Sequence, residues 1–292
     1  MKKGCFIALA AAGILVLTFL SPGARVRKLT VGKVTLIGCM DCPSLAVYET
    51  MESERYYEAS LFNRLPLREK KTFCLDGRSV EGECWKSLKG SCFQADVDVF
   101  NVTGEDGKLV EVSISCTSGE IVGVEPTSLP YTPPEKRLSE DECRIKAYEY
   151  LGQLVEDPGD YLLKEEWSGG GIRNYVFHRL VNGIETISYV RLRILFDGSQ
   201  HGYWKYAPYA FDRIPELRVD SGEADKRIMA ELERLYQNAA GYERLDTVDS
   251  RYLVRLSQDL YAFKYTVTSV LRDKSTGETA YQDRAEFLCY LD

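Results

Sequence analysis

Two cysteines separated by two residues form the pattern in this chain to which a reaction is most readily attached. Cys39 and Cys42 follow an expected strand at residues 33–37 and precede an expected helix within 44–61. Such a pair at a helix N-terminus is the local geometry of a thiol-disulfide oxidoreductase, because the helix dipole stabilises a thiolate there. No strand-helix-strand pattern surrounds the pair, so redox chemistry and a zinc site are alternatives, and structural disulfides are the main expectation.

The N-terminal residues indicate export from the cytoplasm. Lys2 and Lys3 precede an uncharged, largely apolar run at 4–20, and Arg25 follows it. This order is typical of a signal peptide, or of a membrane anchor if the segment is retained, and we assign it to residues 1–24. We therefore expect the protein to be secreted or held at the cell envelope, with its N-terminal segment in the membrane if it is not cleaved.

Export changes the interpretation of the other cysteines. Cys5 lies within the apolar run, which leaves eight of the nine cysteines for the exported protein. An even number of cysteines outside the cytoplasm favours disulfides, although eight allow about 105 complete pairings among which sequence does not choose. The expected disulfide cysteines are Cys39, Cys42, Cys74, Cys84, Cys92, Cys116, Cys143 and Cys289.

Other catalytic patterns are not found in the sequence. The two histidines, His178 and His201, do not form a zinc-binding H-E-x-x-H motif, and Ser199 is not placed as in a nucleophile elbow. We therefore expect no catalytic residues, no cofactor, no metal and no enzymatic activity. The net charge of -7 argues against nucleic acid as a partner, because phosphate binding requires a basic surface.

The elements around these residues are indicated by turns and helix caps. The chain has 292 residues, 45% of them hydrophobic, which is enough for more than one domain. Asn182-Gly183 and Asp197-Gly198 predict tight turns between antiparallel strands. Ser139 and Glu142 form a capping box before a helical pattern, and a second helix is expected after Asp220 or Ser221.

Three similar turns indicate an internal repeat. Gly119, Gly198 and Gly277 each follow an expected strand and precede another, and they lie 79 residues apart in both intervals. Equal spacing of similar turns suggests duplication of a unit of about 80 residues, each unit large enough to bury a core of its own.

These segments resemble a known family. The sequences S-E-D-E-C-R-I-K-A-Y-E-Y-L from Ser139, Y-V-F-H-R-L-V-N-G-I from Tyr175 and V-R-L-R-I-L-F-D-G from Val190 resemble the PepSY-like repeat of the YcdB/YcdC type. The T-S-G-E-I-V-G-V-E segment at 117–125 is similar to the terminal strand of PepSY domains. The resemblance implies an exported or membrane-anchored module, often found beside peptidases, without catalytic residues of its own.

We accordingly expect an α+β fold of tandem PepSY-like units, each with a helix packed on an antiparallel sheet, after the signal or anchor segment. The expected divisions are a cysteine-rich region at 25–137 that fits a degenerate unit, followed by units at 138–215 and 216–292.

An aromatic run suggests where a partner would bind. Tyrosine and tryptophan suit recognition surfaces, and they also cover sheets. The candidate surface consists of Tyr203, Trp204, Tyr206, Tyr209 and Phe211. The leading expectation is a non-catalytic extracytoplasmic protein that binds a protein or peptide, an envelope peptidase among them. The alternatives are an exported thiol-disulfide oxidoreductase using Cys39 and Cys42, and a structural protein of the cell envelope.

Overall fold

The computed structural model describes residues 27–40, 69–75, 77–89, 95–104, 107–127, 137–208, 211, 217–257 and 260–292. These ranges contain two α-helices, one short 3-10 helix and fifteen strands. The expected signal segment and the helix expected within 44–61 lie outside them. No helix in the described ranges has the length and apolar character needed to cross a bilayer.

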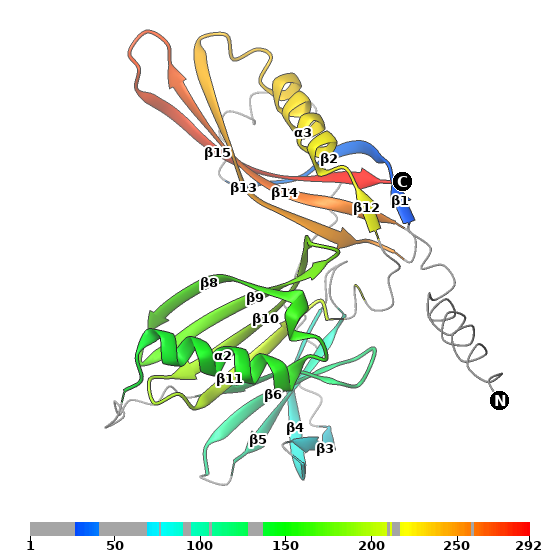
Figure 1. Cartoon of the computed structure of the whole chain (residues 1–292), viewed down its shortest axis with the longest axis vertical. Coiled ribbons are helices and arrows are strands. Elements are labelled where there is room, and N and C mark those ends of the chain that lie inside the picture. Colours follow the sequence, from blue (N-terminus) through cyan, green and yellow to red (C-terminus); the bar gives the residue numbers. More distant parts are fainter. Residues whose placement is uncertain are drawn as a thin grey trace, which may run out of the picture.

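The strands between residues 70 and 126 form an antiparallel meander. Two consecutive hairpins and a further strand make up this part of the sheet, which lies at the bottom of Figure 1. Its strands are β3 (Lys70–Leu75), β4 (Arg78–Leu88), β5 (Val97–Thr103), β6 (Leu109–Ser115) and β7 (Ile121–Pro126).

The middle of the chain forms a second antiparallel meander covered by one helix. Helix α2 lies across β9 and β10, and a small core that includes Phe177 and Leu192 is buried beneath it (Figure 1). The elements are α2 (Glu140–Leu154), the 3-10 turn η2 (Pro158–Asp160), β8 (Tyr161–Gly169), β9 (Ile172–Val181), β10 (Ile184–Leu195) and β11 (Gln200–Tyr206).

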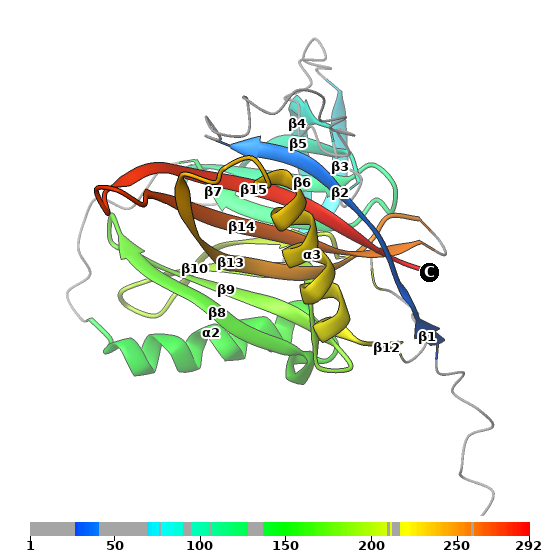
Figure 2. The same cartoon turned by 90° about the horizontal axis from the view of Figure 1, so that it is seen from above.

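The C-terminal part contains the longest strands and the largest core. Helix α3 packs against β15 and against β2, a strand from the opposite end of the chain (Figures 1 and 2). The elements are β1 (Arg27–Leu29), β2 (Val31–Met40), β12 (Leu217–Val219), α3 (Ser221–Leu235), β13 (Tyr242–Arg255), β14 (Tyr261–Asp273) and β15 (Thr279–Leu291).

The expected fold class is wrong. The protein is mainly β, and thirteen strands join in one mixed sheet instead of forming tandem helix-on-sheet units. Strands pair across the expected unit boundaries: β11 with β7, β10 with β13, and β15 with β2. A separate pair, β1 with β12, forms a small parallel sheet. Long-range pairing therefore merges segments that local patterns presented as independent.

The local predictions of turns and caps are confirmed. The Ser139 hydroxyl accepts from the backbone N–H of Glu142, whose carboxylate accepts from the Ser139 N–H, so the capping box forms. Asp220 is the N-cap residue of α3. Asn182 and Gly183 have φ values of 50° and 76°, as a primed hairpin turn requires.

The three turn glycines all adopt positive φ between consecutive strands. Gly119 and Gly277 each donate a backbone hydrogen bond to the carbonyl four residues earlier, whereas Gly198 donates to Leu195, three residues earlier. The first and third turns therefore share a hydrogen-bonding pattern, and the middle turn is one residue tighter.

Candidate functional site

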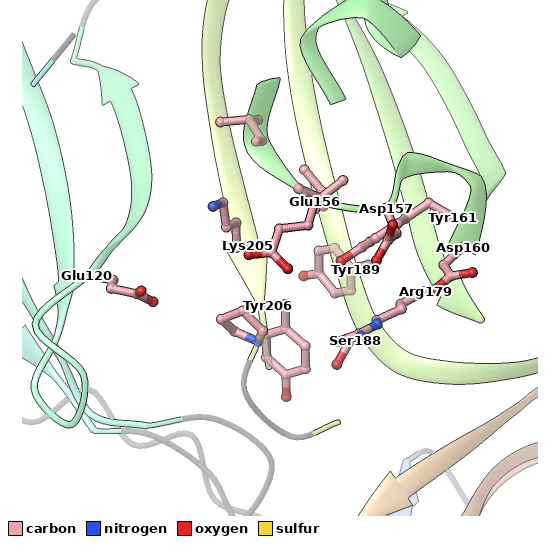
Figure 3. Close-up of a pocket in the computed structure, with 14 residues that line it drawn as sticks. Glu120, Glu156, Asp157, Asp160, Tyr161, Arg179, Ser188, Tyr189, Lys205 and Tyr206 are labelled. Atoms are coloured by element: carbon pink, nitrogen blue, oxygen red, sulfur yellow. The ribbon is translucent and has the colours of Figure 1, made fainter. Parts of the chain in front are cut away.

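A cavity of about 600 Å³ lies where the end of α2, the strands β9 to β11 and the turn before β7 come together (Figure 3). Its wall combines three tyrosines, cations and carboxylates, which come from parts of the chain as distant as Glu120 and Pro208. The lining residues are Glu120, Leu154, Val155, Glu156, Asp157, Asp160, Tyr161, Arg179, Ser188, Tyr189, Val190, Lys205, Tyr206 and Pro208.

Paired strands position two of the tyrosines. Tyr189 of β10 and Tyr206 of β11 are directly opposite each other in the antiparallel register. Their rings stack with centroids 5.1 Å apart and an interplanar angle of 15°. Cross-strand stacking of this kind holds both rings in fixed positions, so this part of the cavity wall is formed before any ligand arrives.

Lys205 contributes a cation that no carboxylate among the described residues contacts directly. It is half-buried, and within the described part of the chain it makes no ion pair. Burial lowers the pKa of its ammonium group, and the carboxylate of Glu120 acts in the opposite direction. A half-buried ammonium group without a close counter-ion favours an anionic group from a ligand.

Carboxylates surround the opening of the cavity. Glu156 and Asp157 follow the C-terminal end of α2, Asp160 ends the 3-10 turn, and all three are exposed (Figure 3). The last turn of α2 contains no basic residue, so the partial negative charge of the helix end adds to theirs. Glu156, Asp157 and Asp160 therefore add negative charge on the side of the cavity that also carries Arg179, while Lys205 provides positive charge within the wall.

A strained residue lies beside the cavity. Ala207 has φ of 48°, a left-handed conformation that costs an L-residue about 1–2 kcal/mol. The hydroxyl of Ser188 donates to the carbonyl of Ala207, and both residues are buried. This hydrogen bond joins the end of β11 to β10 and fixes the chain between Tyr206 and Pro208.

We predict that Ser188→Ala lowers the free energy of unfolding by about 1–2 kcal/mol, because it leaves a buried carbonyl without its donor. Urea denaturation measures the change. Ser199→Ala is the matched control, since its hydroxyl bonds Asp197 on an exposed turn, and we expect a loss of less than about 0.5 kcal/mol. Equal losses in the two variants would contradict the role assigned to Ser188.

The aromatic residues expected to form one surface are divided among different environments. Tyr203 packs against the core under α2, Trp204 lies over Gly123 of β7, and Phe211 is buried in the core under α3. Tyr206 lines the cavity, and Tyr209 lies outside the described residues. The structure therefore places only Tyr206 of this group in the candidate site.

None of the cysteines whose side chains the structure describes lines the cavity. Cys84, Cys143 and Cys289 are buried free thiols in three separate cores, and Cys74 is an exposed free thiol, in place of the expected disulfides at these positions. Burial raises the pKa of the three buried thiols, that of Cys289 to about 11, which keeps them protonated. Cys116 is exposed.

The expected redox pair is described only in part. The backbone of Cys39 lies in β2, opposite Ala285 of β15, and nothing is described of its side chain. Cys42 and Cys92 lie outside the described residues. Among the described side chains, no group of three metal-binding residues comes together.

Sequence reasoning missed Lys205, Tyr189 and the carboxylates after α2. A usable signal was present in Y-W-K-Y, where a lysine lies between aromatic residues within an expected strand. A second signal was the acidic segment that follows the expected end of the first helix. The turn at Asp197-Gly198 predicted that β10 pairs with β11, but it did not give the register that places Tyr189 opposite Tyr206.

Comparison with known proteins does not identify a family. No family model matches the chain, and no curated protein matches it. Among solved structures, the Bacillus megaterium YpeB C-terminal domain superposes with a TM-score of 0.35 and 12% sequence identity, over 65% of this chain and 84% of that one. Similarity at this level establishes neither a shared fold nor a shared function.

Proposed function

We propose that the protein is a non-catalytic extracytoplasmic binding module that takes up a segment of a protein or peptide partner in this cavity. The observation that carries the proposal is Lys205, a half-buried cation without an ion-pair partner among the described residues, in a wall lined by tyrosines. A carboxylate of the partner, from an acidic side chain or a chain terminus, would neutralise it.

The dimensions and chemistry of the cavity support a peptide ligand. A volume of about 600 Å³ is within the range of sites that hold small ligands or a few residues of a peptide. Tyr161, Tyr189 and Tyr206 provide aromatic surface for apolar contact and hydroxyl groups that can hydrogen-bond to a peptide backbone. Backbone recognition combined with a charged anchor is a common mode of peptide binding.

The carboxylates at the opening favour basic residues in the same partner. Glu156 and Asp157 lie at the negative end of α2, where like charges accumulate at a free-energy cost. A lysine or arginine of the partner beside the segment that enters the cavity would relieve this repulsion. The export signal expected at residues 1–24 would place such binding at the cell envelope, where a peptidase is one partner to test.

The test is a selection of phage-displayed random dodecapeptides on the immobilised protein, followed by affinity measurements on the enriched peptides by fluorescence polarisation. We expect these peptides to combine an acidic group with basic residues. Lys205→Met should weaken their binding about tenfold, because it removes the partner of the carboxylate. The same variant should raise the thermal stability of the free protein, since it relieves an unpaired, desolvated charge.

Lys226→Met is the matched control. Lys226 is exposed on α3, away from the cavity, and its replacement changes the net charge by the same amount. We expect it to leave peptide affinity unchanged. A selection that enriches no peptide, or equal losses of affinity in the two lysine variants, would contradict the proposal.

A further inference from the structure

A row of aromatic rings runs from the cavity into the junction between the middle and C-terminal strands. Tyr206 stacks on Tyr189, Tyr189 lies 5.5 Å from His178, and His178 stacks on Tyr252 at 4.8 Å with an interplanar angle of 14°. These four rings come from β11, β10, β9 and β13 in turn. A movement of any one ring must therefore displace its neighbours.

The imidazole of His178 is buried and precisely held. Its Nδ1–H donates to the carbonyl of Thr186 at 3.1 Å, and the Thr186 hydroxyl accepts from the backbone N–H of Ser188. Ser188 in turn holds Ala207 beside the cavity. His178 is thus connected to the cavity by a hydrogen-bond path as well as by the aromatic row.

The junction around His178 is narrow. Strand β10 pairs with β13 through one residue pair, Thr186 with Leu253, within a break in the regular β9–β10 register. Thr186 therefore both accepts a hydrogen bond from His178 and makes the strand contact between the two parts of the sheet. A junction of this size can open with little loss of backbone hydrogen bonding.

Charges face the imidazole from several elements. Strand β8 contributes Lys164 and Glu165, β10 contributes Glu185 and Tyr189, and β13 contributes Tyr252. Oε1 of Glu185 lies 3.6 Å from Nδ1 of His178 and is buried without a hydrogen bond, whereas Oε2 contacts Nζ of Lys164 at 2.6 Å.

Together these groups lower the pKa of His178, so that its ring is neutral at pH 7. Burial lowers the pKa of His178; the Thr186 carbonyl, Glu185 and Glu165 act to raise it, and Lys164 acts with burial. The unfolded chain, with an ordinary histidine pKa of about 6.5, therefore binds the proton more readily than the closed junction does. Acidification below about pH 6.5 must favour conformations in which the imidazole is hydrated.

We propose that His178 is a proton-linked switch for the cavity: protonation separates Tyr252 from the imidazole, shifts Tyr189 and Ser188, and weakens uptake of the partner segment. The proposal rests on the proposed function for its ligand. Its structural half, movement of the cavity wall on protonation, is independent of any ligand.

The structural half is tested by NMR on the full chain without peptide. Backbone amide shifts of Ser188, Tyr189 and Tyr206 are followed from about pH 7.5 to about pH 5. We expect a common titration step below about pH 6.5 that disappears in His178→Phe, a variant that keeps a stacked ring but cannot be protonated. His201→Gln is the control, because it removes the other histidine of the chain and should leave the step in place.

The binding half uses an enriched peptide. Its affinity should fall severalfold over the same pH interval, approaching about tenfold only below both pKa values, if peptide binding lowers the His178 pKa by one unit, and His178→Phe should abolish this dependence. If His178→Phe does not fold, His178→Gln replaces it, and the ring carbon shifts of His178 in the parent protein report the titration directly.

The outcomes separate the two proposals. If no peptide binds at any pH while the amide shifts behave as expected, the proposed function fails and the switch of the cavity wall stands. If peptides bind with the same affinity throughout the pH range, or if the amide shifts persist in the His178 variants, the switch is overturned and the binding function stands.

Discussion

Replacement of Gly202 by alanine is expected to lower the free energy of unfolding by about 3 kcal/mol, near the upper end for overpacked sites. A Cβ atom at this buried position would lie 2.6 Å from the backbone carbonyl oxygen of Val124 and 3.3 Å from Cα of Glu125. Backbone atoms cannot move aside as the end of a flexible side chain can, so β11 and β7 must separate.

The effect should extend to the cavity. Strands β11 and β7 are joined by two residue pairs, Tyr203 with Val124 and Trp204 with Gly123, and the turn before β7 brings Glu120 to the cavity. Urea denaturation measures the stability, and peptide affinity under native conditions measures the integrity of the site. Gly169→Ala is the control: a Cβ there meets no atom within 4 Å, and we expect almost no change. Equal unfolding midpoints for the two alanine variants would contradict this account of the β7–β11 contact.

Phe177→Ala should have the largest effect of the five predictions, a loss of about 3–5 kcal/mol, because it removes a fully buried ring from a small core. Phe177 lies under α2 with Leu192 and Leu151, and Val190 is its pairing partner on β10. The neighbouring side chains are held by α2 and by the sheet, so we expect them to fill the resulting space only in part. Denaturation with urea, with the slope checked for two-state behaviour, measures the loss.

Tyr148 provides the matched control for Phe177. Its ring meets that of Phe177 edge to face at 5.0 Å, but 45% of the residue is exposed. Tyr148→Ala should therefore lose the aromatic contact alone, about 0.5–1.5 kcal/mol. If the two variants lost equal stability, the helix surface rather than the core beneath it would determine the stability of this region.

The features that sequence predicted well depend on neighbouring residues. The turn at Asn182-Gly183 follows from the preference of both residues for positive φ, and the start of α2 follows from the Ser139 and Glu142 side chains. Neither of these features requires knowledge of which strand lies next to which.

The prediction of the fold class failed because pairing between distant strands leaves little signal in the local sequence. Thr186 pairs with Leu253, and Trp204 with Gly123, yet nothing within β10 or β11 indicates a partner beyond its own hairpin. Sequence identified the hairpins and presented them as separate units. Their union into one sheet depends on side-chain fit, such as that of Trp204 over Gly123, which only a three-dimensional structure shows.

The site was only partly foreseen for a related reason. Successive residues of a strand point to opposite faces, so Tyr203 belongs to a different core from Trp204 and cannot form one surface with Trp204 and Tyr206. That division follows from strand periodicity alone. The combination of Lys205 with Tyr189 required the register of β10 with β11, and the contribution of Glu120 required the β7–β11 pairing.

The position of β2 has a consequence for the order in which the chain folds. Strand β2 pairs with β15, so Val34 lies opposite Cys289 and Leu36 opposite Phe287, and Leu36 and Ile37 join the core under α3. These contacts connect residues about as far apart in sequence as the chain allows, and closing such loops slows folding. During synthesis, which proceeds from the N-terminus, β2 remains without its partner strand until β15 has been made. During that interval the exposed edge of β2 can pair with other chains, so aggregation should compete with folding mainly before the last strand is added.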